Sequence, residues 1–410
     1  RCARRFPFRR RVCYRGHPVT HSSQSRPAPK HPTIRRRSEL DALAARVVGT
    51  HRAAPGAVVA CAWRAGDAWT IDEGAAGQLA PGWAEVTPDT IYDLASVTKP
   101  FVAVALARLV RQGPLSLDTR LDVLVRESQG TQSASVPLEL LLAHRSGLEG
   151  HRPLYAPLMQ GKPVSRYRAL VEAARARRPE CSGEPPAAGF SPVYSDLGFL
   201  LLGEAITRGG GAPLDAAVHA QICAPLGMGI ASARQWRART AHFDDCVAPT
   251  EVVDWRGGVV RGQVHDENAW ALGEDGMCGH AGLFGTARDV ARFGAALIDV
   301  VSGRAGGWLT REDLEPLIRV RDGGTLRAGF DGKSETGSSA GASCSSSAFG
   351  HLGFTGTSVW IDPEQQIAVT ILSNRVQPTR DNDAIKRARP DVNEALFAWA
   401  RAQRGNPSEP

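Results

Sequence analysis

Short apolar runs separated by turn residues lie towards both ends of the chain. Residues 57–64 and 68–71 are two such runs on either side of Gly66-Asp67. Apolar runs that flank a Gly-Asp turn predict a β-hairpin. Residues 358–362 and 367–372 repeat the pattern and predict a second hairpin. Strands at both ends suggest one sheet built from both, with the middle of the chain inserted between them.

Helical patterns lie before the first hairpin and between the two hairpins. Residues 39–48, 138–142 and 197–207 have the apolar spacing of helices. Thr286-x-x-Asp289 resembles a capping box and predicts the start of another helix. No internal repeat interrupts this order.

These patterns predict three parts. We expect a basic, disordered tail over residues 1–38 and a sheet domain formed by residues 39–114 and 280–405. A mainly helical domain, residues 115–279, is inserted between the two halves of the sheet domain. The 410 residues are 42% hydrophobic, which is enough for a substantial core. No stretch approaches the roughly 18 apolar residues of a membrane span, so none is expected.

The formal net charge of +7 is unevenly distributed. Residues 1–38 contain 12 Arg or Lys and no Asp or Glu, so the remainder carries a net charge of −5. A basic tail is typical of a solvated extension, and binding to nucleic acid or anionic lipid through phosphates is the alternative. No apolar core of a secretory signal follows the basic stretch, so we expect no export signal in these residues.

The eight cysteines are scattered irregularly, without a C-x-x-C pair or a Cys/His spacing of the zinc type. His17 and His21 are four residues apart, but Pro18 argues against a helical metal site between them. We expect free thiols, no metal and no cofactor.

Ser96-Val-Thr-Lys99, followed by Pro100 and an apolar helical run, is the most informative element. If Ser96 opens this helix, the i, i+3 spacing puts the Lys99 amine beside the Ser96 hydroxyl. A serine needs an adjacent base to become nucleophilic, and a desolvated lysine can be that base. The helix N-terminus favours negative charge developing there.

Tyr194-Ser195-Asp196 precedes the predicted helix of residues 197–207. A Tyr oxygen near a Lys ammonium ionises more readily, so Tyr194 could act as base towards Ser96. The alternative is a helix cap, with Ser195 or Asp196 as N-cap and Tyr194 as a hydrophobic staple.

A third element, Gly350-His-Leu-Gly353-Phe-Thr-Gly-Thr357, leads into the strand that contains Trp360. Glycines in a strand let a substrate approach the backbone closely. The Phe354 N–H can pair with the Ser96 N–H to hold an oxyanion. His351 could hydrogen-bond substrate or steady Tyr194, or it is a structural strand histidine.

Together the three elements resemble the penicillin-recognising serine hydrolases. The match is closest to the class C β-lactamase branch, which also contains DD-peptidases and β-lactamase-like esterases. Further similar stretches are residues 141–148, 279–284 and 372–375. The likeness runs from about residue 39 to 397. It implies an α/β (α+β type) fold, in which an antiparallel sheet from both chain ends is flanked by helices and carries the inserted helical domain.

The resemblance also implies roles for individual residues. Ser96 would be the acylated nucleophile, with Lys99 and Tyr194 sharing proton transfer, and the identity of the base stays open. Phe354 and Ser96 would supply oxyanion N–H groups. His351, Gly353 and Asp196 would line the substrate site, as would Arg375 or Arg380, which could hold a substrate carboxylate or be solvated arginines.

Two departures from the family pattern bear on the substrate. Many members have Asn where this chain has Asp196, so an acceptor-only carboxylate replaces an amide that could donate. Leu352 replaces a Thr or Ser and removes a hydroxyl. Both changes argue against efficient β-lactam hydrolysis.

Two other segments attract attention. Residues 264–269 hold a His, an acid and an amide, but no nucleophile neighbours them in sequence, so a hydrogen-bonded loop explains them equally well. Residues 334–347, rich in Ser, Gly and Ala, predict a flexible loop. Its position before the third motif implies a place at the rim of the cleft.

The resemblance implies a serine hydrolase acting on D-Ala-D-Ala-type peptides, β-lactams or small esters. The alternatives are a penicillin-binding sensor that acylates without efficient turnover, and a nucleic-acid or membrane-surface partner acting through the tail. We expect a small-molecule or peptide substrate. Oligomeric state and compartment stay open, since the family's cell-wall members are periplasmic while a cytoplasmic place is equally compatible with this sequence.

Overall fold

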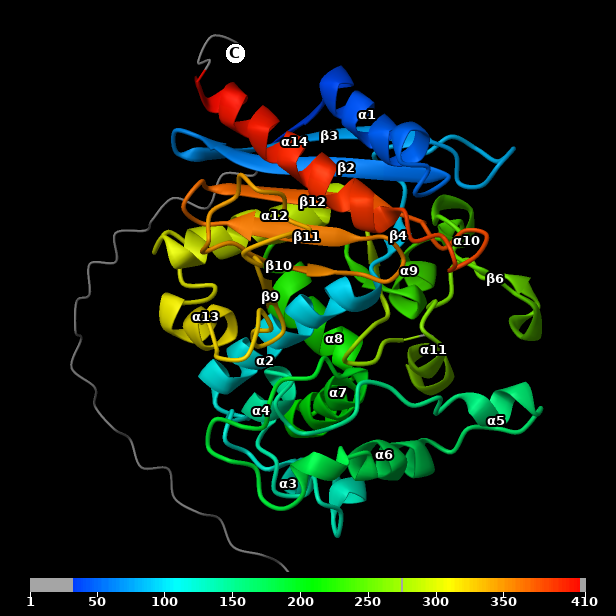
Figure 1. The fold of residues 1–410 in the computed structure, drawn as a ribbon, viewed down its shortest axis with the longest axis vertical. Coiled ribbons are helices and arrows are strands. Elements are labelled where there is room, and N and C mark those ends of the chain that lie inside the picture. The colour runs from blue at the N-terminus through cyan, green and yellow to red at the C-terminus, as the bar shows by residue number, and fades with distance from the viewer. Residues whose placement is uncertain (1–31, 274–275, 406–410) are drawn as a thin grey trace, which may run out of the picture. The chain divides into compact units, whose positions relative to one another are not determined.

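The computed structural model describes residues 32–273 and 276–405 (Figure 1). Most of the predicted basic tail, residues 1–31, lies outside the described residues. A seven-stranded sheet occupies the upper part of Figure 1, with strand order β1-β3-β2-β12-β11-β10-β9. The strands are β1 (Thr33–Arg36), β2 (Gly56–Ala65), β3 (Ala68–Gly77), β9 (Asp331–Gly332), β10 (Phe349–Leu352), β11 (Ser358–Asp362) and β12 (Ile367–Ser373).

Both predicted hairpins are confirmed as β2–β3 and β11–β12. They join into one sheet because β12 pairs antiparallel with β2, with Val369 opposite Cys61. The sheet therefore combines the two ends of the chain, as the pattern suggested.

The first strand corrects two predictions. β1 pairs parallel with β3, so the sheet is mixed and not antiparallel throughout. Residues 33–36, assigned to a disordered tail by their charge, are a strand. The physical reason is Asp72, a fully buried carboxylate in β3. Arg35 and Arg37 donate to Asp72 Oδ1 at 3.0 and 3.2 Å and hold the segment on the sheet.

Alternate residues of the central strands face opposite layers. Val58, Ala60 and Ala62 of β2 join the core on one face, while Val59 and Cys61 join a second cluster on the other. This alternation is the period of two that an extended strand imposes. Helix α12 (Ala287–Val301) covers the first face, and α1 (Ser38–Ala45) and α14 (Ile385–Gly405) cover the second (Figure 1).

The helical part lies below the sheet in Figure 1 and packs around α2 (Thr98–Gln112). Eleven of the 15 residues of α2 are buried, from Thr98 to Leu109, so this helix is enclosed on nearly every side. The other helices of this part are α3 (Leu121–Leu124), α4 (Leu138–Leu142), α5 (Ala156–Met159), α6 (Arg166–Arg175), α7 (Asp196–Gly210), α8 (Leu214–Val218), α9 (Ala233–Arg239), α10 (Phe243–Cys246) and α11 (Glu267–Gly273), and α13 (Arg311–Ile318) follows α12. The core cluster on the α12 side of the sheet continues without a break into these helices.

Short pieces of sheet position the loops between the helices. A three-stranded sheet has the order β4-β8-β5, and β6 pairs with β7 in a separate ribbon. These strands are β4 (Tyr92–Asp93), β5 (Ala231–Ser232), β6 (Val252–Val253), β7 (Gly258–Val259) and β8 (Leu283–Gly285). β4 matters most for the site, because it ends three residues before Ser96.

Two local predictions need correction. Thr286 is the N-cap of α12, but its hydroxyl donates to Asp289 at 3.3 Å and caps no backbone N–H, so there is no capping box. Residues 334–347 pack beneath α14 instead of lying at a cleft rim. Ala340 and Cys344 are buried there, and the Ser343 N–H donates to Glu394 of α14 at 2.8 Å.

Within the described ranges, no helix has the length and apolar character to cross a membrane. The six cysteines there are all free thiols, and five of them are buried.

Candidate active site

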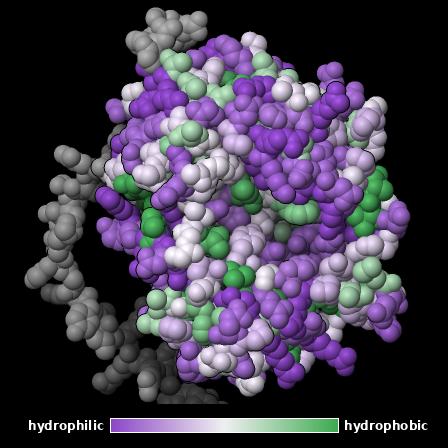
Figure 2. All heavy atoms as spheres, in the orientation of Figure 1, coloured by the Kyte–Doolittle hydropathy of each residue, from purple (hydrophilic) through white to green (hydrophobic). Residues whose placement is uncertain are grey.

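A cavity of about 570 Å³ opens where the edge of the sheet meets the helical part. Figure 2 shows this face hollowed near its centre, with both hydrophobic and hydrophilic residues around the hollow. Every residue that the sequence singled out for the site lines this cavity except Lys99, which is buried beneath its wall. The residues on the wall are Ser96, Tyr194, Asp196, His351, Gly353, Phe354, Arg375 and Arg380.

Ser96 lies in a tight turn between β4 and α2. Residues Ala95–Val97 form a single 3₁₀ turn that runs directly into the helix. Ala95 has a φ of 46°, which is costly for a residue with a side chain. Asp93 stabilises this turn because its carboxylate accepts the Ala95 N–H at 2.8 Å. The turn presents the Ser96 hydroxyl to the cavity.

Lys99 links the predicted motifs. Its Nζ lies 2.9 Å from Ser96 Oγ, 2.6 Å from the Tyr194 hydroxyl and 2.7 Å from Asp196 Oδ1. The side chain is fully buried, which disfavours its charged form. Asp196 and Tyr194 outweigh this burial and raise the pKa of Lys99, so the resting group is an ammonium.

Tyr194 lies between two imidazole rings. His144 stacks on its ring at a centroid distance of 4.8 Å, and His351 lies at 5.9 Å on the cavity side. Loss of water around the hydroxyl raises the pKa of Tyr194, and Lys99 offsets this only in part. Burial therefore outweighs Lys99, which lowers the pKa of Tyr194 as expected, and the net pKa shift of Tyr194 is upward. The resting group is a neutral phenol.

Ser195, the middle residue of the second motif, is an N-cap. Its Oγ accepts the Gly198 N–H at 3.0 Å and donates to the Glu149 carbonyl at 2.6 Å. Its own N–H donates to His144 Nδ1 at 3.0 Å. The cap alternative thus holds for Ser195, while the residues on either side of it face Lys99.

His351 is a neutral histidine on the cavity wall. Its Nδ1 lies 2.8 Å from the Leu352 carbonyl, so this nitrogen carries the proton and Nε2 is left as an acceptor. Burial and the nearby Lys99 lower the pKa of His351 to about 3. At neutral pH this position therefore offers an acceptor, not a cation.

Gly353 and Phe354 follow β10 and lie against the Ser96 turn. A Cβ on Gly353 would stand 1.9 Å from Thr357 Oγ1 and 2.6 Å from the Leu94 carbonyl, so only glycine permits this approach. Phe354 N–H has no hydrogen-bond acceptor in the described part of the chain. Ser96 N–H is in the first helical turn, where it has no acceptor within the helix.

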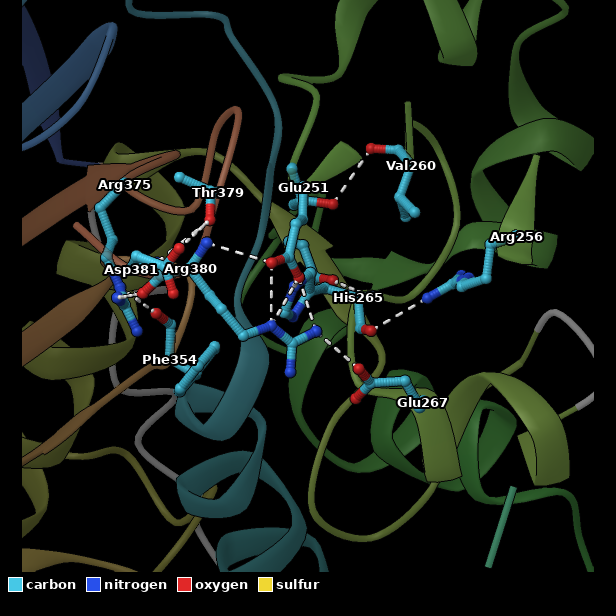
Figure 3. Close-up of polar contacts among 12 residues, drawn as sticks. Glu251, Arg256, Val260, His265, Glu267, Phe354, Arg375, Thr379, Arg380 and Asp381 are labelled. Atoms are coloured by element: carbon cyan, nitrogen blue, oxygen red, sulfur yellow. Dashed lines mark hydrogen bonds and ion pairs between the residues drawn. The ribbon is translucent and has the colours of Figure 1, made fainter. Parts of the chain in front are cut away.

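The two arginines of the sequence analysis differ in exposure, and both have partners within the protein. Arg375 is only 8% exposed, and its Nε donates to the Phe354 carbonyl at 2.7 Å. Arg380 is held by Glu251 and Glu267 (Figure 3). Arg380 lies in an exposed stretch, with 40% of its side chain accessible, yet both of its carboxylate partners come from the inserted helical part, which sequence reasoning could not place.

Other cavity residues escaped the sequence analysis. His265, Asp266 and Glu267 line the wall, although they were set aside for lack of a neighbouring nucleophile. Arg389 of α14 also lines it and is buried, and its Nε has no hydrogen-bond partner in the described residues. Its Nη2 donates to the Gly353 and Thr357 carbonyls at 2.6 and 2.9 Å. No local pattern marks Arg389, because its helix contains several arginines.

Comparison with known proteins gives a consistent result. The family model described as Beta-lactamase matches residues 40–394. The chain is 28% identical over 312 residues to the N-acetylmuramyl-L-alanine amidase of Bacillus subtilis (strain 168), a match that spans 71% of this chain and 69% of that protein. It is 27% identical over 333 residues to a Salmonella agona (strain SL483) protein named as a D-alanyl-D-alanine carboxypeptidase, over 76% of this chain and 74% of that one.

Solved structures show the same fold. That of EstCE1, described as a hydrolase with promiscuous acyltransferase activity, superposes with a TM-score of 0.65 at 18% identity. The match covers 87% of this chain and 97% of EstCE1. At 18% identity, this structural similarity supports a shared β-lactamase/transpeptidase-like fold and nothing beyond the fold.

Proposed function

Because the chain belongs to the Beta-lactamase family of hydrolases, we propose that it is a serine hydrolase that forms an acyl-enzyme on Ser96. One observation carries the proposal. A buried ammonium, Lys99 Nζ, lies within 2.9 Å of both the Ser96 hydroxyl and the Tyr194 hydroxyl. A serine hydroxyl beside a group that can take its proton, with a cation that stabilises the charge that develops, is an activated nucleophile.

The resting protonation state favours a relay. With Lys99 an ammonium and Tyr194 a phenol, neither group is a free base before substrate binds. As Ser96 Oγ attacks the substrate carbonyl, its proton passes to the Tyr194 oxygen, and the Tyr194 proton passes on to the leaving group. Tyr194 gains one proton and loses one, so it ends the step neutral. The Lys99 ammonium stabilises the negative charge that develops on the Tyr194 oxygen during the transfer. A water molecule then attacks the acyl ester by the reverse relay.

The negative charge that develops on the carbonyl oxygen needs donors fixed in advance. The unpartnered N–H groups of Ser96 and Phe354 are the two candidates. His351 would accept a hydrogen bond from the substrate through Nε2. Gly353 permits the close approach of this strand to Ser96.

The substrate class follows from the charges on the wall. Arg389 has no carboxylate partner in the described residues, and Arg375 contacts carbonyls and a ring. Burial and the nearby Arg375 lower the pKa of Arg389 to about 9. An uncompensated buried cation favours an anionic group, such as the carboxylate of a D-Ala-D-Ala-type peptide or of a β-lactam. Asp196 and Leu352, which argue against efficient β-lactam hydrolysis, disfavour a small ester least.

A second candidate is a protein that acylates without efficient turnover. It is supported by the raised pKa of Tyr194, since little of the phenol is ionised at neutral pH and the water that must attack the acyl ester then finds little free base to take its proton. The two candidates share the first chemical step and differ in the second.

Steady-state assays test the proposal. Wild-type protein is offered a short-chain p-nitrophenyl ester, a D-Ala-D-Ala tripeptide and a penicillin, with Ser96→Ala and Lys99→Met as variants. We expect turnover of at least one substrate, with a loss of about 10³-fold or more in each variant. Undiminished turnover in Ser96→Ala contradicts the proposal.

A further inference from the structure

Phe354 is anchored more firmly than its exposure suggests. Its side chain is 49% exposed on the cavity wall, yet three groups flank the ring. The His265 ring stacks on it at 5.6 Å with an interplanar angle of 19°, and the Arg375 guanidinium lies 4.3 Å from its centroid. The Arg380 guanidinium lies at 5.7 Å. Cation–π contacts of this kind fix an aromatic ring in place.

One carboxylate holds two of these three flanking groups. Glu251 accepts from Arg380 Nε at 2.9 and 2.8 Å and from the Arg380 backbone N–H at 3.0 Å. Its Oε2 also lies 3.0 Å from His265 Nε2. Burial opposes its charge, but the bonds from His265 and Arg380 prevail and lower the pKa of Glu251 to about 2. Figure 3 shows Glu251 between Arg380 and His265, with Phe354 beyond them.

Glu251 itself does not face the substrate. It is 6% exposed and does not belong to the cavity wall, unlike His265, Arg380 and Phe354. Any effect of Glu251 on the reaction must therefore pass through the groups that it holds.

Hydrogen bonds also connect His265 to the Ser96 turn. The His265 N–H donates to Asp93 Oδ2 at 2.7 Å, and Asp93 Oδ1 accepts the Ala95 N–H. The Asp93 carbonyl accepts the Thr355 hydroxyl at 2.8 Å, one residue beyond Phe354. Asp93 thus ties together the two segments that carry the candidate oxyanion donors.

We infer that Glu251 is a positioning residue for the oxyanion hole, acting through Arg380 and His265 on Phe354 and on the Ser96 turn. This inference rests on the proposed function, because it presumes acyl transfer to Ser96. A 1 Å displacement of one donor is enough to slow such a reaction by about 100-fold. Neither the motifs nor the spacing of the sequence marks Glu251.

The test is the kinetics of Glu251→Gln on an activated short-chain ester. We expect kcat to fall about 10- to 100-fold while KM changes less than about threefold, because the lost interaction acts in the transition state. Glu251→Asp, which keeps the charge, should recover part of kcat. The matched control is Glu127→Gln, since Glu127 is 4% exposed and pairs with Arg208 at 2.7 Å far from the cavity.

A double variant separates positioning from stability. Glu251→Gln leaves Arg380 short of a partner, and Glu251→Gln/Arg380→Gln removes that uncompensated charge. We expect the double variant to regain thermal stability without regaining kcat. Recovery of kcat together with stability, or a kcat for Glu251→Gln equal to that of Glu127→Gln, overturns the inference.

The outcome also distinguishes this inference from the proposed function. If a fluorophosphonate fails to label Ser96 in the wild-type protein, the proposed function itself fails. If it labels wild type and Glu251→Gln at the same rate, acyl transfer stands and the positioning role of Glu251 falls.

Discussion

Four oxygen atoms surround the ammonium of Lys99: those of the Ser96, Tyr194 and Asp196 side chains and the His280 carbonyl. An ammonium has three N–H donors, so these acceptors compete for them. The His280 contact is the longest, at 3.3 Å. Because Ser96 Oγ is the acceptor in its contact with Lys99, its own proton is not used there and can be passed to Tyr194, as the proposed relay requires.

Replacing Asp196 with Asn tests the electrostatics of this group. Asp196 is the main influence that raises the pKa of Lys99, and it also raises that of Tyr194, so Asp196→Asn should lower both. The proposed relay needs both groups protonated, so activity should then be lost at lower pH. We expect the falling limb of kcat/KM to move down by about one pH unit. Asp299→Asn is the control, and an unmoved limb in Asp196→Asn contradicts this electrostatic account.

His351 should make the protein less stable in mild acid. Its folded-state pKa of about 3 lies below the ~6.5 of an unfolded chain, so between these values the unfolded state binds more protons. This contribution to stability is complete above pH 6.5 and is lost as the pH falls towards 3.

Urea unfolding at pH 6.5 and pH 5 measures the effect. We expect His351→Gln to lose about 2 kcal/mol less than the wild-type protein over this interval. His242→Gln, at a ring that is 81% exposed, should behave like wild type. Equal losses in wild type and His351→Gln contradict a neutral, buried His351.

At the residue scale, the sequence predicts those site residues that are marked by short spacing or by a motif. Ser96 and Lys99 could be paired from their i, i+3 spacing, and Tyr194 joined them through motif order. Arg389 and Glu251 could not be found, because their significance depends on contacts 36 and 129 residues away, with Gly353 and Arg380. The His265 segment was noticed but not placed, since only the folded chain brings it to the cavity.

Among the elements, β1 is a strand although its arginine-rich composition predicts a solvated tail, because a buried carboxylate needs those arginines. A run of arginines predicts a solvated tail, yet Asp72 on β3 is fully buried and needs partners. Trp63 Nε1 donates to Asp72 at 2.6 Å, and Arg35 and Arg37 supply the positive charge. Hairpins and the long helices were predictable from periodicity, whereas this pairing and the packing of residues 334–347 under α14 depend on tertiary contacts.

Removing β1 should cost stability at Asp72. A chain that begins at Ser38 leaves this carboxylate without its arginines, and we expect the free energy of unfolding to fall by about 1–3 kcal/mol. A chain that begins at residue 32 is the control. Asp72→Asn in the shorter chain should recover part of the loss, because it removes the unpaired charge. No difference between the two truncated chains contradicts the role given to β1.

At the scale of the whole described chain, the sheet face under α12 and the helices around α2 share one continuous core. Val58 and Ala368 of the sheet belong to the same cluster as Leu141 and Leu201 of the helical part. The predicted division into a sheet domain and an inserted helical domain describes the sequence order and stays a prediction.

A shared core predicts that the two parts unfold together. We expect tryptophan fluorescence and far-UV circular dichroism to report one coincident transition in urea. Two separate transitions would show that the inserted segment is an independent folding unit, and the account of a common core would then be wrong.

The central claim, covalent catalysis by Ser96, is tested most directly by intact-mass spectrometry after brief exposure to a penicillin and, separately, to an activated short-chain ester. We expect a mass increase equal to one acyl group, mapped to the Ser96 peptide and missing in Ser96→Ala. A persistent penicillin adduct would indicate the DD-peptidase or sensor form of the reaction, and ester turnover without a penicillin adduct would indicate an esterase. A protein that stays unmodified and turns over neither reagent, or an adduct that Ser96→Ala retains, would contradict the claim.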